Sequence, residues 1–320
     1  MTRSRLILEL AAAALLVALP LGSDWVFNAY YLDLATRIVI IWIALLGYDL
    51  LAGYAGLVSL GHAMYFGLGA YGAAWILLYA APSLILLLLV GITIATVAAV
   101  VIGFLSTRTR GVYFILLTLI FAEFGYQAVF NGGTITGGQN GLSSLPKAAT
   151  SIPPIGTFDW NDPASAYYLA LAVFAVAYAV ARWIVQSPFG ATLAALRDNE
   201  DRAMYLGYDV AVIKRRVLVL SAMFAGCSGA LWAHHQSYVS PELMHWTLSG
   251  QFLIMTWLGG VGTLVGPLLG GAVITYFADF LSSIMKNWLI VFGVLYIMVV
   301  LYAPEGLWGL VLRICRSATR

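Results

Sequence analysis

Histidine and acidic side chains are the groups in this chain that could perform catalysis or bind a metal, and they are few. His234, His235 and His245 lie close together in the sequence, with Glu242 beside them. A zinc site needs about four well-spaced ligands, and no cysteine or carboxylate pair completes this set. A membrane enzyme using His234 or His235 is an alternative, although no Ser-His-Asp set can be assembled from the spacing. We expect no metal site and no catalytic residue, and we expect His62 to be a polar residue with its hydrogen bonds satisfied.

Glu123 and Gln127 form a second candidate pair. Glu123 is taken as the one acidic residue well inside an apolar run, and Gln127 follows one helical turn later. Because a charge in hydrocarbon costs about 2.5 kcal/mol or more, Glu123 should face protein or a water-filled path. Lining that path and making a structural hydrogen bond or partner-subunit contact are both open roles. Direct coordination of an amino group is a third.

Charge gathers in one part of the chain. The sequence has 16 Lys and Arg and 14 Asp and Glu, and nine of these residues fall between Ala191 and Arg216. We name residues 187–216 the charged segment. Two interpretations are open: a solvated connection between membrane spans, or a short helix along the membrane that docks into a groove on a cytoplasmic partner.

Capping residues predict how the charged segment folds. Ser187 and Pro188 suit the N-cap and first position of a helix, and Gly207, with positive φ, suits its end about five turns later. Asp209 suits the cap of the next helix. Five residues are expected on an apolar side of the first helix: Leu193, Leu196, Ala203, Met204 and Leu206. Three basic residues are expected to mark the membrane boundary: Lys214, Arg215 and Arg216.

The rest of the chain is strongly apolar. Hydrophobic residues make up 62% and charged residues 9%, and the mean hydropathy is +0.92, whereas soluble domains are roughly 25% charged. Lipid cannot hydrogen-bond the backbone, and apolar runs of about 17 to 25 residues fit helices. We therefore predict an all-α integral membrane protein, a polytopic helical bundle in a lipid bilayer. The net charge of +2 is too small to indicate nucleic-acid binding.

Apolar runs and basic residues together predict the topology. Ten runs are bounded by Gly, Pro or charge: 6–22, 36–52, 63–80, 84–106, 112–130, 166–186, 217–234, 248–260, 264–284 and 288–303. The first resembles a signal peptide, but we expect it to remain as a helix. With both termini cytoplasmic, only three of the 16 Lys and Arg lie outside: Arg37, Lys147 and Lys286. We predict a single domain over 1–320 with about ten segments, some short or broken, an outer turn-rich loop at 131–163 and a cytoplasmic charged segment.

Two glycine clusters lie at the predicted cytoplasmic ends of spans. Both contain Gly-x-x-Gly, at 53–56 and 259–262, which indicates an internal repeat. Such glycines are often close-packing points between helices. Alternatively, the helices are broken there and freed backbone groups line a solute path. The path candidates are then Glu123, Gln127, Gly53, Gly56, Ser59, Gly61, Gly259, Gly260 and Gly262.

The charged segment resembles a known family. "SPFGATLAALRDNEDRAMYLGYDVAVIKRRVLVLSAMFAGCSGAL" is similar to the cytoplasmic coupling region of LivM-type permease subunits of branched-chain amino acid ABC importers. The matching residues, which the resemblance assigns to ATPase coupling, are Gly190, Arg197, Asp198, Asn199, Glu200, Ala203 and Gly207. The chain departs from the pattern at Ala191-Thr192, where Arg-Ala is usual.

Four further stretches resemble the same family in order and spacing. They are "GYAGLVSLGHAMYFGLGAYGAA", "TRGVYFILLTLIFAEF", "TGGQNGL" and "SPELMHWTLSGQFLIMTWLGGVGTLVGPLLGGAVI". The resemblance covers residues 36–312. It identifies an outer-loop signature at Thr136, Gly137, Gly138 and Gly141.

The resemblance implies a permease subunit that is not itself an enzyme. Its expected partners are a second LivH-type permease subunit, two cytoplasmic ATPase subunits and a periplasmic substrate-binding protein, in a bacterial inner membrane. The chain lacks the G-x-x-x-x-G-K-[ST] phosphate loop, so ATP and Mg²⁺ are expected on the partner ATPase subunits and no cofactor on this chain. Branched-chain amino acids, other amino acids, amides and carboxylates are all possible solutes. A self-sufficient secondary transporter or channel is the alternative.

Overall fold

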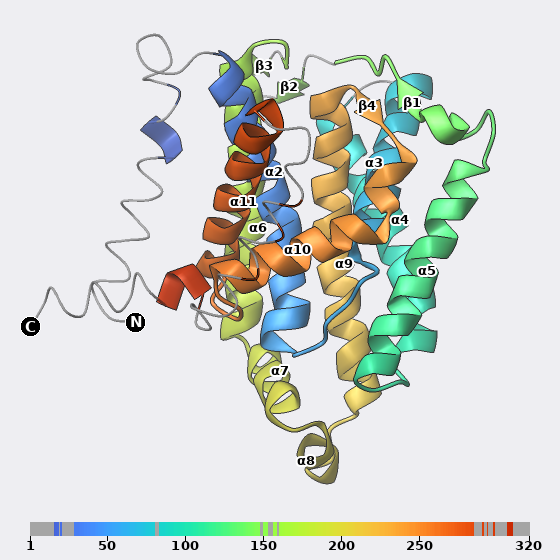
Figure 1. The fold of residues 1–320 in the computed structure, drawn as a ribbon, viewed down its shortest axis with the longest axis vertical. Coiled ribbons are helices and arrows are strands. Elements are labelled where there is room, and N and C mark those ends of the chain that lie inside the picture. The colour runs from blue at the N-terminus through green and yellow to red at the C-terminus, as the bar shows by residue number, and fades with distance from the viewer. Residues whose placement is uncertain are drawn as a thin grey trace, which may run out of the picture.

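Helices dominate the protein (Figure 1). The computed structural model describes residues 29–80, 83–147, 150–152, 156–158 and 160–284, with short pieces at 16–18, 20, 290, 293, 297 and 306–309. The helices are α2 (Ala29–Tyr48), η2 (Asp49–Tyr54), α3 (His62–Tyr79), α4 (Leu84–Ser106), α5 (Val112–Phe130), η3 (Gly138–Asn140), α6 (Pro163–Gln186), α7 (Pro188–Asp198), α8 (Glu200–Tyr205), α9 (Val210–Gln236), η4 (Pro241–Met244), α10 (Trp246–Gly259) and α11 (Val265–Ile284). The strands are β1 (Leu142–Ser143), β2 (Thr150–Ile152), β3 (Gly156–Phe158) and β4 (Tyr238–Val239).

Six segments of the described chain are long and apolar enough to cross a membrane. They are the continuous α2–η2 segment, α4, α5, α6, α9 and α11. The protein is therefore an all-α, multi-pass membrane protein. α10 has only 14 residues, fewer than the about 20 that a full span requires. Apart from isolated positions, the predicted runs 6–22 and 288–303 lie outside the described residues.

Predicted and observed helix bounds agree closely where turn residues flank the helix. α4 and α5 occupy the predicted ranges 84–106 and 112–130. α9 differs, because it begins at Val210 and not near 217, so the basic run from Lys214 to Arg216 lies inside the helix. The Asp209 side chain accepts the N–H of Val212 at 3.1 Å. The cap therefore fixes the start of α9, as its residue type predicted.

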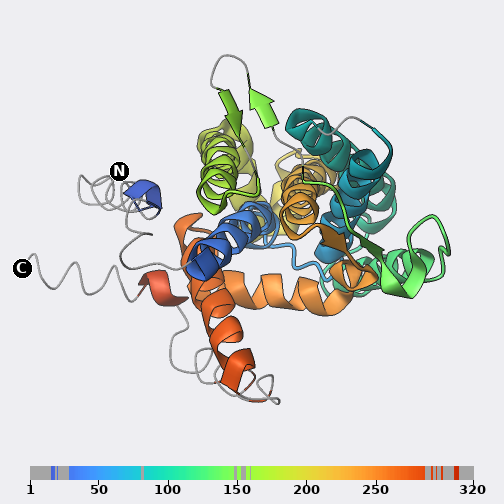
Figure 2. The same ribbon diagram turned by 90° about the horizontal axis from the view of Figure 1, so that it is seen from above.

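α9 lies in the middle of the bundle, with α6 on one side and α3 and α4 on the other (Figure 2). In the most apolar 18-residue window of α9, 72% of residues are buried, against 17% for α5. Glycines permit this close packing. A Cβ on Gly229 would lie 1.9 Å from the carbonyl oxygen of Phe66 in α3, and one on Gly69 would lie 2.2 Å from that of Gly226. The backbones of α3 and α9 are thus in direct contact, as small residues allow in membranes.

Hydrogen bonds join α9 to α2 as well. Ser221 donates to the carbonyl oxygen of Gly47 at 2.6 Å, and Ser228 donates to that of Ile40 at 2.5 Å. α2 then continues into the π-helical turn η2, and residues 55–61 run without regular helix before α3 begins. This break is the discontinuity that one of the two interpretations of the glycine cluster expects.

The outer-loop signature is held by turns and by a strand pair. Thr136 donates to the carbonyl oxygen of Val129 at 2.6 Å, which folds the loop back on the end of α5. Gly137, Gly138 and Gly141 all have positive φ, between 55° and 74°. β1 pairs with β4, and β2 with β3, both antiparallel. The predicted turn-rich loop therefore also contains short strands, one of which ties it to the end of α9.

Candidate functional site

The charged segment folds at one end of the bundle, where α7 and α8 project beyond the long helices (Figure 1). Ser187 begins α7 as predicted, because its hydroxyl oxygen accepts the N–H of Gly190 at 3.4 Å and Pro188 occupies the first turn. A Cβ on Gly190 would lie 2.1 Å from the carbonyl oxygen of Val185. Only glycine therefore fits this sharp turn from α6 into α7.

A break at Asn199 divides the segment into two helices, so the prediction of one helix from 187 to 207 is wrong. Asn199 is extended, with φ −164° and ψ 111°, and its side chain accepts the N–H of Arg202 at 2.8 Å to cap α8. Gly207 has the predicted positive φ, +89°. The signal for the second start is an Asn directly before two acidic residues, since caps and acidic first turns favour helix N-termini.

Ion pairs fasten α8 to the rest of the bundle. Glu200 lies 2.7 Å from Lys214 Nζ of α9 and 3.0 Å from Arg110 Nε of the α4–α5 connection. Only 1% of the Lys214 side chain is exposed, and its ammonium also donates to the carbonyl oxygen of Thr109 at 3.4 Å. Arg110 pairs with Asp201 at 2.6 Å. The hydrogen bond to Asp201, with the nearby Glu200 charge, raises the pKa of Arg110, so that guanidinium stays charged.

The apolar residues of the charged segment divide between core and surface. Leu193, Leu196 and Ala203, which were expected on an apolar side, are buried. Met204 and Leu206 were expected on the same apolar side but are exposed, because the break at Asn199 separates them from the α7 residues. We name four exposed residues the apolar tip: Met204 (45% exposed), Tyr205 (88%), Leu206 (70%) and Tyr208 (43%).

The two predicted glycine clusters meet each other and the charged segment. Arg197 of α7 donates from Nη1 to the carbonyl oxygen of Gly53 at 2.7 Å. A Cβ on Gly53 would lie 2.6 Å from the backbone nitrogen of Gly262. Asp49 lies between them and is fully buried. The expectation that Glu123 was the one acidic residue well inside an apolar run was therefore wrong, because Asp49 lies in the predicted run 36–52.

The other glycine candidates lie at tight contacts or strained turns. A Cβ on Gly61 would lie 2.6 Å from the carbonyl oxygen of Thr118, and one on Gly259 would lie 1.8 Å from that of Gly266. Gly56 and Gly260 have φ of +72° and +120°. The buried Ser59 accepts the N–H of Gly61 at 3.1 Å. These contacts explain why small residues are needed there, and lining a solute path stays a prediction for them.

Glu123 and Gln127 are hydrogen-bonded to each other, one helical turn apart on α5. Gln127 Nε2 donates to Glu123 Oε1 at 2.9 Å, and Asn131 Nδ2 donates to the Gln127 carbonyl oxygen at 2.9 Å. Glu123 is half-buried and Gln127 is exposed on the outer face of α5. We name Glu123, Gln127 and Asn131 the polar row on α5. Polar side chains on a membrane helix require a polar neighbour or water. Its role in a solute path stays a prediction.

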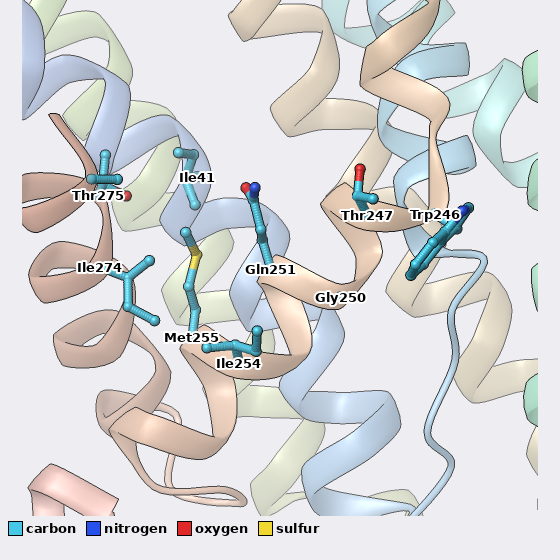
Figure 3. Close-up of a pocket in the computed structure, with 10 residues that line it drawn as sticks. Ile41, Trp246, Thr247, Gly250, Gln251, Ile254, Met255, Ile274 and Thr275 are labelled. Carbon is cyan, nitrogen blue, oxygen red and sulfur yellow. The ribbon is translucent and has the colours of Figure 1, made fainter. Parts of the chain in front are cut away.

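An open groove of about 330 Å³ lies between α2, α10 and α11 (Figure 3). Thr247 and Gln251 extend from the same side of α10, and Thr275 of α11 contributes a third polar side chain. Four aliphatic or thioether side chains complete most of the lining: Ile41, Ile254, Met255 and Ile274. The groove was not predicted, because residues from three distant segments form it.

The histidines are mostly enclosed by aromatic rings. His62 is buried against the ring of Tyr48 at 5.1 Å, and its ring nitrogens have no hydrogen-bond partner among the described residues. The expectation of satisfied hydrogen bonds at His62 is thus not met. His234 contacts the ring of Trp160 at 4.3 Å, and His235 lies 2.9 Å from Asp33. In the described ranges, no three His, Cys, Asp or Glu residues gather as metal ligands do.

Taken together, the long apolar helices, the broken helix at η2 and the projecting charged segment define a polytopic helical membrane protein. Residues 30–301 match the family described as "Branched-chain amino acid transport system / permease component". Because this match covers most of the chain, the protein belongs to that family. It is a transport component and not an enzyme.

Two relatives carry the same description. The chain is 28% identical over 313 residues to the high-affinity branched-chain amino acid transport system permease protein LivM of Escherichia coli (strain K12), covering 92% of this chain and 74% of that protein. It is 28% identical over 293 residues to LivM of Salmonella typhimurium (strain LT2), covering 86% of this chain and 69% of that protein. No solved structure matches the chain.

Proposed function

We propose that this chain is a permease subunit of an ATP-driven ABC importer that moves a small polar solute into the cytoplasm. The solute would be a branched-chain amino acid, or a related amino acid, amide or carboxylate. Family membership supports the transport role, and both relatives are named as permeases of high-affinity branched-chain amino acid transport systems. A second LivH-type permease, two cytoplasmic ATPase subunits and a periplasmic binding protein would complete the importer. ATP and Mg²⁺ would bind to the ATPase subunits.

The apolar tip is the observation that carries this proposal. It covers the end of α8 and the turn into α9, and α8 lies beyond the long helices at the bottom of Figure 1. Asp198, Arg202 and Asp209 are close to the tip in the sequence and are exposed, so lipid is a poor environment for this surface. Large exposed apolar side chains with a charged rim are typical of protein interfaces. The tip therefore fits a groove on a cytoplasmic ATPase subunit.

The contacts of α8 provide a route for movement from the tip into the membrane. Glu200 joins α8 to Lys214 near the start of α9 and to Arg110, which lies two residues before α5. When ATP closes the two ATPase subunits, displacement of α8 would move both helices. The importer would then change between inward-facing and outward-facing conformations. The reason is that the ATPase subunits with and without ATP bind these two conformations with different affinity.

The proposal includes a topology and a path. The chain would cross the bacterial inner membrane ten times with both termini in the cytoplasm, so that the charged segment is cytoplasmic and residues 131–163 lie outside. The polar row on α5 and the groove beside α10 would line the solute path together with the second permease. Both surfaces carry polar side chains in the membrane region, which supports their contact with water or solute.

Reconstitution tests this function directly. The permease pair, the ATPase pair and the binding protein are placed in liposomes, and uptake of radiolabelled leucine, isoleucine and valine is measured with ATP or a non-hydrolysable analogue. We expect uptake only with ATP and binding protein. Uptake by this chain alone, driven by a proton or sodium gradient, would instead establish a secondary transporter.

A further inference from the structure

Three segments that are far apart in the sequence meet beside Asp49. They are η2 at the end of α2, the 260–264 turn between α10 and α11, and α7 of the charged segment. Asp49 accepts the N–H of Gly262 at 2.7 Å with Oδ1 and the N–H of Leu264 at 3.1 Å with Oδ2. Both carboxylate oxygens of one fully buried residue are thus used to hold a single turn.

The turn that Asp49 holds is strained. Gly260, Gly262 and Leu264 have φ of +120°, +73° and +58°. Leu264 is one of few residues other than glycine with positive φ among the described residues, and such a conformation costs about 1–2 kcal/mol. It persists only when the surrounding structure determines it. The Asp49 carboxylate supplies that determination, because charge-assisted hydrogen bonds are stronger than neutral ones.

Arg197 lies close to both glycine clusters, at 53–56 and at 259–262. Its Nη1 donates to the Gly53 carbonyl oxygen at 2.7 Å, and its Cγ would lie 3.2 Å from a Cβ on Gly56. A Cβ on Gly262 would lie 2.8 Å from the same Nη1. The guanidinium therefore occupies the space between the two glycine clusters, near enough to Asp49 to attract its carboxylate.

We propose that Asp49 and Arg197 are the positioning residues that join α7 to the 260–264 turn, so that movement of the charged segment is transmitted to α10 and α11. This inference rests on the proposed function. Arg197 pulls on η2 through the Gly53 carbonyl, and Asp49 transfers the displacement to the turn through two backbone N–H groups. We name this route, from Arg197 through Asp49 to the 260–264 turn, the relay. α10 and α11 form two walls of the groove in Figure 3, so the relay ends at a surface that can contact solute.

The two ends of the relay differ in stiffness. Asp49 is fully buried and bonded to rigid backbone, so its contacts cannot be exchanged for water cheaply. Arg197 keeps part of its surface exposed and contacts η2 through its hydrogen bond to the Gly53 carbonyl oxygen. We expect the Asp49 contact to persist through the transport cycle and the Arg197 contact to change length or partner.

The test compares transport with ATP hydrolysis in the reconstituted importer described above. Asp49→Asn keeps the size of the side chain but replaces one acceptor oxygen with a donor, which faces a backbone N–H. We expect leucine uptake per ATP hydrolysed to fall about tenfold, the range of a typical coupling energy, while hydrolysis itself continues. Asp279→Asn is the matched control, because Asp279 is an acid of α11 outside this arrangement, bonded to Tyr30 and Arg37.

A second pair of variants moves Arg197 without changing any charge. Gly262→Ala adds a Cβ that must displace the Arg197 guanidinium, and its φ of +73° adds backbone strain. Gly133→Ala is the control, because Gly133 has φ +58° and nothing within 4 Å of its Cβ position. We expect Gly262→Ala to lower uptake per ATP as Asp49→Asn does, and Gly133→Ala to leave that ratio unchanged.

A purely structural role gives a different result. If Asp49 only stabilises the fold, Asp49→Asn lowers the amount of folded importer and its unfolding temperature, but the uptake per ATP of the folded fraction equals that of wild type. That outcome, or an equal loss in the Asp279→Asn control, overturns the relay. Failure of the wild-type importer to couple uptake to ATP would instead contradict the proposed function, so the two ideas fail separately.

Discussion

Replacing Glu200 with Gln tests whether the ion pairs hold α8 in place. The Lys214 side chain is 1% exposed, and its ammonium donates to Glu200 Oε1 at 2.7 Å and to the Thr109 carbonyl oxygen at 3.4 Å. Gln keeps an acceptor oxygen but removes the charge. A buried charge that loses its counter-ion typically costs about 3–5 kcal/mol. Because one acceptor remains and Glu200 is 25% exposed, we expect a loss of about 2–3 kcal/mol in the free energy of unfolding.

Removing the other partner of this ion pair should lower the free energy of unfolding by less. Lys214→Met leaves Glu200 paired with Arg110 at 3.0 Å and open to water on one side. We expect a loss of about 1 kcal/mol. The double variant should then lose less than the sum of the two single variants, since no uncompensated buried charge remains. Asp201→Asn is the control, because Asp201 is 62% exposed and its pair with Arg110 lies at the surface.

Denaturant titration of the detergent-purified protein, followed by tryptophan fluorescence, measures these free energies by linear extrapolation. The expected order of loss is Glu200→Gln, then Lys214→Met, then Asp201→Asn with no measurable change. The reasoning is refuted if Lys214→Met costs more than Glu200→Gln, or if Glu200→Gln behaves like the surface control.

Three further substitutions test local features of the fold. Ser187→Ala removes the cap of α7 and should lower the free energy of unfolding by about 1 kcal/mol, measured by the same titration. Gly207→Val places a β-branched residue at φ +89° in open space, so we expect loss of ATP-driven uptake with normal membrane insertion, and a smaller effect for Gly207→Asn. Gly229→Val must push α9 away from the Phe66 carbonyl oxygen and should abolish the monodisperse peak in size-exclusion chromatography, whereas Gly250→Ala, with open space around its Cβ, should keep it.

Local signals in the sequence predicted the parts of the fold that local chemistry determines. The caps Ser187 and Asp209 and the positive φ of Gly207 depend on hydrogen bonds and sterics within a few residues. The bounds of α4 and α5 follow from apolar runs that end at turn residues. The spacing of Glu123 and Gln127 placed them one turn apart, but their hydrogen bond to each other is shown only by the structure.

Contacts between distant segments could not be predicted in this way. Asp49 and Gly262 are 213 positions apart, and only the fold shows that one holds the other. The exposure of Met204 and Leu206 depends on the break at Asn199, which a helix-by-helix pattern overlooked. Glycine-rich stretches indicated close packing or a broken helix, but the choice of contact partner is a tertiary property.

The central claim is that an ATPase subunit binds the apolar tip, and site-specific photo-crosslinking tests it most directly. A benzoylphenylalanine is placed at Tyr205, which is 88% exposed at the tip, or at Tyr238, which is 43% exposed at the opposite end of α9. We expect the probe at 205 to capture the ATPase subunit in the assembled importer, with a yield that changes when ATP is added. Capture of the ATPase from position 238, or none from position 205, would contradict the account.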